Sequence, residues 1–223
     1  MTAETKRLLI YGDSNSWGYL DDGLGHRFER RWPVEMCRHL SAVQPVTLIE
    51  ECLPGRTTNI DDPVMGTAYN GLSPLEAVLL SHQPLDHIVI MLGTNDLKAR
   101  FSRSAEDIAS AAVGLANLAR SVPAGRGGWS GGQTSEVSLV CPLVLGQRAG
   151  DPAWERADEW AGAPEKSAAL AAAFQAACHT ANIRLIDGNL FGRSSARDPI
   201  HWDAQTHLEF GEGMARTLQP NLC

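Results

Sequence analysis

The sequence has few cysteines, and their spacing builds neither a disulfide framework nor a metal site. Five cysteines are scattered over 223 residues, with no C-x-x-C pair among them. An odd number excludes a complete set of internal disulfides, and the unpaired spacing argues against structural zinc. We therefore expect buried thiols in a reducing compartment, no metal, and a cytoplasmic protein.

Long apolar runs and an excess of positive charge are also missing. The apolar run at residues 8–11 is too short for a signal-peptide core, and no stretch approaches the roughly 20 apolar residues that cross a bilayer. With 19 Lys and Arg against 26 Asp and Glu, the net charge is -7. Binding to nucleic acid needs a basic face, so we expect neither nucleic acid nor a membrane as a partner.

The overall composition is that of an ordinary globular domain. Hydrophobic residues make up 43% of the chain and charged residues 20%, both near the average for folded proteins. A chain of this length can bury a sizeable core, and neither an internal repeat nor a linker divides it. We predict a single domain over residues 1–223.

Short apolar runs alternate with stretches of helical period along the chain. Strands are predicted at 8–11, 45–50, 87–92, 137–141 and 183–186, and helices at 32–40, 74–82, 104–121, 164–181 and 204–218. This alternation is typical of right-handed βαβ crossovers in an α/β protein. The predicted fold is a three-layer α/β/α arrangement with a five-stranded parallel sheet in the flavodoxin-like order 2-1-3-4-5. Ligands of such sheets bind at the carboxyl ends of the strands.

A serine follows the first predicted strand, in the run Gly12-Asp13-Ser14. The ligand crevice of this type of sheet is expected there. Glycine permits a tight turn, and the backbone N–H groups that follow can face a substrate oxygen. Taken alone, the tripeptide is equally compatible with an ordinary capped turn between a strand and a helix.

Two possible hydrogen-bond donors follow the second and third predicted strands. Gly55 can bring its backbone N–H close to a ligand because no side chain blocks the approach. Asn95, in Gly93-Thr94-Asn95-Asp96, can donate from its amide to a developing oxyanion. Each residue also has a purely structural interpretation. Gly55 would serve only a backbone conformation that needs glycine, and Asn95 would be a turn residue whose side chain bonds its own backbone.

An Asp-Pro-Ile-His run precedes the last predicted helix. Asp198 stands three residues before His201, close enough to accept a hydrogen bond from the imidazole and to fix its tautomer. Among the seven histidines, His201 alone combines this local carboxylate with a place in a loop. His207 falls inside the last helix and is a weaker rival.

The combination of these groups resembles a known family. The chain is similar to the SGNH hydrolase superfamily (GDSL-type esterases), whose four hallmark residues match Ser14, Gly55, Asn95 and His201 in family order. The stretches 50–63 and 90–98 look like the bacterial arylesterase and acyltransferase branch. That resemblance implies hydrolysis of small acyl esters, acyl transfer to alcohols or peroxide, and homo-oligomers with a confined channel.

The resulting hypothesis is a serine esterase that needs no cofactor and acts on a small-molecule ester. His201, oriented by Asp198, removes the Ser14 proton, and the serine oxygen attacks the ester carbonyl to form an acyl-enzyme. The expected oxyanion donors are the backbone N–H groups of Ser14 and Gly55 and the amide of Asn95.

Five side chains are candidates for the substrate pocket. Asn15 stands where the family usually has leucine, and would make the mouth of the pocket more polar. Trp17, Tyr19 and Trp202 flank the nucleophile and the base in sequence, and Lys98 follows Asn95 by three positions. Core packing for at least one aromatic residue, and a solvated Lys98, are equally good interpretations.

Three alternatives to a small-ester esterase remain at this point. A carbohydrate O-deacetylase would use the same catalytic set on a polar substrate, and a lysophospholipase or thioesterase would need room for a long chain. A flavodoxin-like binding module, with Ser14 and Ser16 cradling a phosphate, is the alternative from outside enzymology. The sequence lacks the glycine-rich phosphate loop with lysine that such a module would use. This interpretation also gives no role to Asp198 and His201.

Two irregular segments complete the reading. Within 124–134, Ser130 lies in a G-x-S-x-G match, but that pattern identifies a nucleophile only between a strand and a helix. We do not expect Ser130 to be catalytic. The segment 143–163, with Trp154 and Trp160, either lines the site, contacts another subunit or is a surface excursion.

Overall fold

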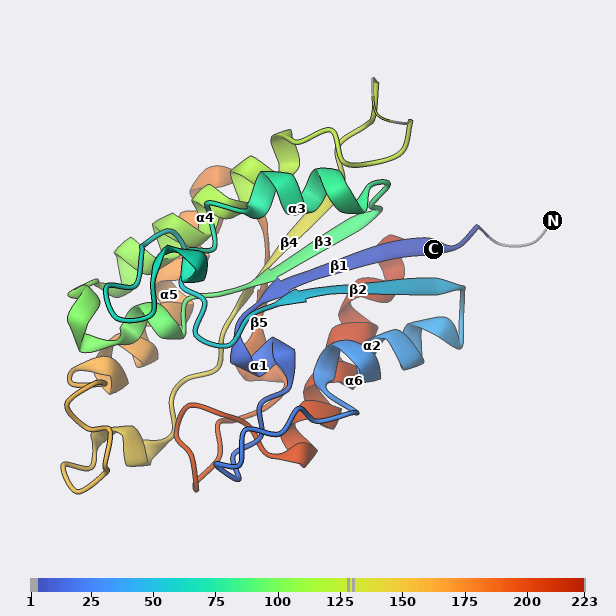
Figure 1. The fold of residues 1–223 in the computed structure, drawn as a ribbon. Helices are drawn as coiled ribbons and strands as arrows, with labels where there is room; N and C mark the ends of the chain where they lie inside the picture. Colours follow the sequence, from blue (N-terminus) through green and yellow to red (C-terminus); the bar gives the residue numbers. More distant parts are fainter. Residues whose placement is uncertain (1–3, 128, 130, 223) are drawn as a thin grey trace.

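The computed structural model describes residues 4–127, 129 and 131–222 (Figure 1). Its centre is one parallel sheet in the order β2-β1-β3-β4-β5. The strands are β1 (Lys6–Gly12), β2 (Val46–Cys52), β3 (His87–Met91), β4 (Glu136–Cys141) and β5 (Arg184–Asp187). The predicted fold class and strand order are confirmed, and the predicted strand ends differ from these by no more than two residues.

Helices cover both faces of the sheet and make three layers (Figure 1). One face carries α3 (Leu75–His82), α4 (Ala105–Ser121) and α5 (Ala163–Ala181), and the other carries α2 (Trp32–Ser41) and α6 (Ala204–Leu222). A one-turn helix, α1 (Ser14–Trp17), was not predicted, because four residues are too few to show a helical period. Short 3-10 turns include η2 (Asn95–Leu97) and η4 (Gln147–Gly150).

The strands bury different side chains on their two faces. In β1, Leu9 and Tyr11 pack with the α3, α4 and α5 side, while Leu8 and Ile10 pack with α2 and α6. All five residues of β3 are buried, as expected of a central strand covered on both faces. The sheet is therefore clamped from both sides, and its carboxyl edge is a fixed base for the loops that follow.

The long segment 143–163 is anchored to this core. Trp154 and Trp160 are 5% and 1% exposed, and both belong to the larger apolar cluster. The backbone N–H of Ala99 donates to the Glu159 carbonyl at 2.8 Å. A free surface excursion is thus the wrong interpretation of this segment.

No helix in the described part of the chain is long and apolar enough to cross a membrane.

Close contact between α2 and α6 generates a prediction about Gly211. A Cβ added at Gly211 would lie 2.8 Å from both the Trp32 carbonyl oxygen and Glu35 Cβ. We expect Gly211→Ala to destabilise the protein by about 1–3 kcal/mol, because the helices must move apart. Gly114, inside α4, is the matched control: an added Cβ there meets nothing within 4 Å, and Gly114→Ala should stabilise by up to about 1 kcal/mol. Urea unfolding followed by circular dichroism measures both, and equal effects would contradict the close packing.

Candidate active site

Ser14 is the first residue of α1, directly after β1. Asp13 caps this helix, and its Oδ1 accepts the backbone N–H of Asn15 at 3.0 Å. Gly18, with a φ of 96°, ends the helix after one turn. The short helix holds the Ser14 side chain at the carboxyl edge of the sheet, where it is 5% exposed.

A line of two hydrogen bonds joins Ser14, His201 and Asp198. Ser14 Oγ lies 3.1 Å from His201 Nε2, and Asp198 Oδ2 lies 2.6 Å from His201 Nδ1. Because the carboxylate accepts at Nδ1, the network assigns the proton to Nδ1 and leaves the Nε2 lone pair facing the serine hydroxyl. The arrangement can take a proton from the serine as its oxygen attacks an electrophile.

The turn between Asp198 and His201 keeps the carboxylate ionised. Asp198 Oδ1 also accepts the backbone N–H of Ile200 at 2.8 Å. Burial raises the pKa of Asp198, but the hydrogen bond and charge of His201, with the backbone N–H donors, outweigh it, so the net pKa is lowered. A negative charge therefore stays beside the imidazole at neutral pH.

Gly55 lies in a β-turn that follows β2. Residues 53–56 form this turn, closed by a backbone hydrogen bond of 3.0 Å between its first and last residues. Pro54 and Gly55 hold the central positions, and the φ of +91° at Gly55 is typical of the third residue of a type II turn. A Cβ at Gly55 would lie about 3 Å from the Met65 methyl group and the Tyr69 ring, at 3.0 and 3.1 Å. The positive φ therefore favours glycine, and a larger residue would also press on these two side chains.

Asn95 is tied to the same turn. It begins η2 after β3, is 5% exposed, and its Nδ2 donates to the Arg56 carbonyl at 3.1 Å. An amide group has two N–H donors. One is fixed on the residue that follows Gly55, and the other is left for a ligand oxygen.

Arg56 connects the Gly55 turn to the end of β1. Its guanidinium lies 4.2 Å from the Tyr11 ring centroid and donates to the Gly12 carbonyl at 3.2 Å and to the Glu51 carbonyl. The side chain is 6% exposed. This contact fixes the distance between the strand that leads to Ser14 and the turn that carries Gly55.

A buried carboxylate braces the Gly55 and Asn95 loops against each other. Asp96 is fully buried and accepts the Thr58 backbone N–H at 2.9 Å, the Thr58 hydroxyl, and Arg103 Nη1 at 2.9 Å. Burial raises the pKa of Asp96, against the opposing effects of Thr58 and Arg103. Sequence analysis missed this brace because Asp96 and Thr58 are 38 positions apart, and no local pattern links them.

Asn15 connects the turn that carries Ser14 to the loop that carries Asp198 and His201, here called the histidine loop. It is 2% exposed, and its Nδ2 donates to the Ile200 carbonyl at 3.2 Å. The sequence suggested a polar pocket mouth at this position. The structure places the amide in a buried contact beside His201, which leucine could not make.

Aromatic residues near the site take different positions. Trp17 is partly exposed, and the Arg27 guanidinium lies 5.4 Å from its ring centroid. Trp202 is fully buried and packs against Phe210 at 4.6 Å between ring centroids, so core packing describes it. Tyr19 is partly exposed, and its ring stacks on the imidazole of His201.

His207, the rival histidine, lies behind the site. It is fully buried, and its Nδ1 accepts the Trp32 backbone N–H at 3.4 Å. Burial lowers the pKa of His207 to about 4. The ring is therefore neutral at physiological pH and packs beside Trp202 at 5.3 Å between centroids.

Lys98 contacts the long segment after β4. It is 4% exposed, with Nζ 3.6 Å from Glu159 Oε1 and 5.6 Å from the Trp160 ring centroid. Burial and the nearby charge of Arg100 lower the pKa of Lys98, while Glu159 raises it. A solvated lysine is the wrong interpretation. The side chain joins the segment that follows Asn95 to the loop around Glu159.

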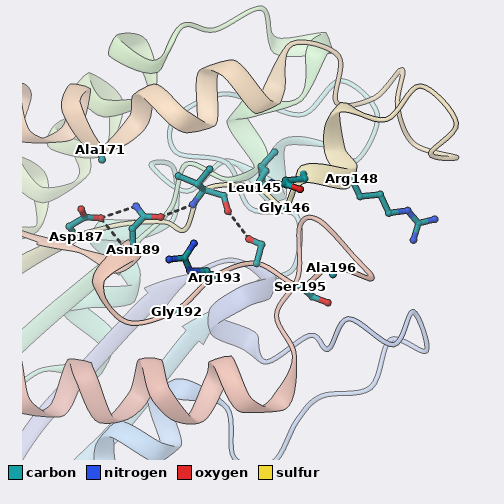
Figure 2. Close-up of a pocket in the computed structure, with 13 residues that line it drawn as sticks. Leu145, Gly146, Arg148, Ala171, Asp187, Asn189, Gly192, Arg193, Ser195 and Ala196 are labelled. Carbon is teal, nitrogen blue, oxygen red and sulfur yellow. Dashed lines mark hydrogen bonds between the residues drawn. The ribbon is translucent and has the colours of Figure 1, made fainter.

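A cavity of about 870 Å³ lies beyond the histidine loop, at the carboxyl ends of β4 and β5 (Figure 2). No predicted site residue lines it. Two of its lining residues bond the backbone of the histidine loop. The Gly146 N–H donates to the Pro199 carbonyl at 2.8 Å, and the Ser195 N–H donates to the His201 carbonyl at 3.2 Å. Its wall therefore supports the loop that carries Asp198 and His201.

Two further points concern the predicted site. Ser130 lies outside the residues that the structure describes. Across residues 4–127, 129 and 131–222, no three or more His, Cys, Asp or Glu side chains gather in a group that could hold a metal ion.

The buried carboxyl of Asp13 generates a prediction about stability and pH. Asp13 is 1% exposed, and burial raises its pKa from 3.8 to about 6. A raised folded-state pKa stabilises the fold below the unfolded pKa, and this contribution is lost as the pH rises through about 6. Asparagine does not titrate, so the free energy of unfolding of Asp13→Asn should rise by up to about 3 kcal/mol relative to that of the wild type between pH 4 and pH 7. Urea unfolding measures this difference.

A matched control for this experiment is Asp151→Asn. Asp151 is exposed and, like Asp13, accepts the backbone N–H two residues further on, from Ala153 at 2.9 Å. Its substitution should not change stability with pH to the same extent. A constant difference between Asp13→Asn and the wild type at every pH would contradict the raised pKa.

Comparison with known proteins agrees with this geometry. The model of the GDSL-like Lipase/Acylhydrolase family matches residues 10–209, whereas no curated protein matches the chain significantly. Among solved structures, Est24, a carbohydrate acetylesterase from Sinorhizobium meliloti, is 29% identical with a TM-score of 0.87, over 97% of this chain and 99% of its own.

Two arylesterase structures are also similar to the chain. The inhibitor-bound aryl esterase of M. smegmatis is 31% identical with a TM-score of 0.86, and a putative arylesterase from Agrobacterium tumefaciens is 31% identical with a TM-score of 0.79. Each match covers 96% of this chain and 99% of the other. The flavodoxin-like binding module shares the strand order but not this family. The chain belongs to the GDSL-like Lipase/Acylhydrolase family and is a carboxylic ester hydrolase.

Proposed function

We propose that the chain hydrolyses small acyl esters through an acyl-enzyme, with Ser14 as nucleophile. His201 serves as general base and then general acid, and Asp198 orients and stabilises its imidazole. The observation that carries this proposal is the unbroken line of hydrogen bonds from Asp198 through His201 to Ser14, at 2.6 and 3.1 Å.

Acylation begins when His201 Nε2 accepts the proton of Ser14 Oγ as that oxygen attacks the ester carbonyl carbon. The tetrahedral intermediate then expels the alcohol, which takes the proton from His201. In deacylation, water loses a proton to His201 and attacks the acyl carbon, and the proton returns to Ser14 as the carboxylic acid leaves.

Three donors support stabilisation of the oxyanion. Ser14 begins α1, so its backbone N–H has no acceptor within the helix. Gly55 presents its N–H from the turn after β2, and Asn95 has a second amide hydrogen beyond the one bonded to Arg56. Loss of one such donor typically costs roughly 2.7–4 kcal/mol of transition-state stabilisation.

The covering of Gly55 supports a preference for small acyl groups. The Met65 methyl group and the Tyr69 ring lie against the face of Gly55, and both stand beside the proposed oxyanion donor. A longer acyl chain on this side would have to displace them. Aryl esters remain suitable, because their bulk lies in the alcohol.

Carbohydrate acetyl esters are the second candidate substrate, supported by the similarity to two carbohydrate acetylesterase structures from Sinorhizobium meliloti. Comparing kcat/KM for p-nitrophenyl acetate and acetylated xylose separates the two substrate classes. Adding an alcohol or peroxide to the same assay tests acyl transfer, because a competent acceptor diverts the acyl group from water into a new ester or peracid.

The proposal treats the chain as one hydrolase domain, which the family match over residues 10–209 supports. We further propose a cytoplasmic homo-oligomer. The resemblance of residues 50–63 and 90–98 to the arylesterase and acyltransferase branch supports the homo-oligomer. Light scattering of the purified protein measures the subunit number.

Replacement of the nucleophile tests the mechanism. We expect Ser14→Ala to lower kcat by about 10⁴-fold or more and to abolish both the acylation burst and labelling by a fluorophosphonate. Ser16→Ala is the matched control, because Ser16 lies two residues further along α1 and is fully buried; it should retain burst and labelling. Retained turnover in a folded Ser14→Ala protein would refute the assignment.

A graded series of p-nitrophenyl esters tests the preference for small acyl groups. We expect kcat/KM to fall from acetate to octanoate, and Met65→Ala to raise the rate on octanoate about 10-fold relative to acetate, because truncation opens the wall beside Gly55. Met36→Ala, in the core of α2, controls for general loosening. Rates that rise with chain length in the wild type would favour a lysophospholipase or thioesterase instead.

A further inference from the structure

Tyr19 covers one face of the His201 imidazole. The two ring centroids lie 4.3 Å apart with an angle of 28° between the planes, a stacked arrangement. Tyr19 is held in this position by its backbone: its N–H donates to the Ser14 carbonyl at 3.0 Å, and the residue forms a β-bridge with Arg27. The segment that ends the nucleophile helix therefore also supplies the residue that stacks on the base.

This face contact restrains the ring in a direction that its hydrogen bonds do not. Asp198 and Ser14 contact Nδ1 and Nε2, two atoms at the edge of the imidazole. The N–H and the lone pair of an imidazole point outward in the ring plane, so hydrogen bonds at these two atoms resist tilting of the ring only weakly. A flat ring packed on the face resists tilt directly and carries a negative π surface that attracts a positive neighbour.

We propose that Tyr19 is a positioning residue for His201: its ring holds the imidazole in line with Ser14 and stabilises the imidazolium that forms as the serine attacks. The inference rests on the proposed function, because it concerns the protonation cycle of the same site. It assigns the aromatic ring, not the phenol hydroxyl, as the active part of the side chain.

Other groups also influence the charge of His201. Asp198 bonds Nδ1, the Asp13 carboxyl lies just before α1, and the neutral ring of His207 lies behind the site on α6. His207 is bonded to the backbone of Tyr19, not to its side chain, so the leucine and phenylalanine variants of Tyr19 keep the same set of neighbours. A change in the protonation of His201 in such a variant can therefore be attributed to the loss of the stacked ring.

The test compares Tyr19→Leu, which removes the π face, with Tyr19→Phe, which keeps it. We expect Y19L to lower kcat/KM for p-nitrophenyl acetate about 5- to 30-fold, mainly through kcat, because cation–π contacts of this kind contribute on that scale. The acid limb of its pH profile should move about 0.5–1 pH unit lower, since the imidazolium loses a favourable contact. Y19F should stay within about 2-fold of the wild type.

A second measurement does not depend on turnover. NMR of the imidazole protons of His201 in the resting protein should show loss of the ring-current shift and a lower titration midpoint in Y19L, but not in Y19F. If the wild type lacked esterase activity while these NMR differences remained, the proposed function would fail and the stacking inference would stand.

Specific outcomes would overturn the inference. One is a Y19L protein with raised KM but unchanged kcat and acid limb, because Tyr19 would then be only a wall of the substrate pocket. Another is a Y19F protein as impaired as Y19L, which would assign the effect to the hydroxyl. Circular dichroism checks the fold, and Tyr19→Met replaces Y19L in every comparison if the leucine variant does not fold.

Discussion

Parallel strand pairing is the constraint on which the rest of the structure depends. Because β1, β2 and β3 run in the same direction and pair side by side, their carboxyl ends reach one edge of the sheet. Three residues that lie far apart in sequence, Ser14, Gly55 and Asn95, follow these strands at that edge. The loop before α6 lies at the same edge, because Asn15 in α1 donates a hydrogen bond to its Ile200 carbonyl.

The alignment of strand ends places the loops only approximately. Specific long-range hydrogen bonds then fix their positions relative to one another. Arg56 fastens the Gly55 turn to β1, and Asp96 with Thr58 fastens the same turn to the loop of Asn95. These hydrogen bonds are buried, so removal of one partner leaves the other unsatisfied and destabilises the fold by its full desolvation penalty. Preorganised donors are effective in catalysis because they need not be reoriented as charge develops, and such bracing supplies that rigidity.

Sequence reasoning succeeded where one local pattern determines the outcome. Apolar runs and helical period predicted every strand and the five longer helices, and the Asp198–His201 spacing predicted a contact that needs only one turn of chain. It failed where an outcome depends on packing between distant segments. Trp202 is adjacent to His201 in sequence but points into the core against Phe210, and Asn15 bonds the backbone of a residue 185 positions away. Neither orientation leaves a signal in the local residue pattern.

The imidazole and its carboxylate lie on a single short turn, with two residues between them in sequence. The carboxylate also accepts two hydrogen bonds from backbone N–H groups. Insertions or deletions elsewhere in the chain cannot separate them. Asp198 and His201 therefore form one local unit, whereas the segment 143–163 is held by buried contacts with distant parts of the chain. A change of sequence in such a segment alters what surrounds the pair without altering the hydrogen bonds inside it.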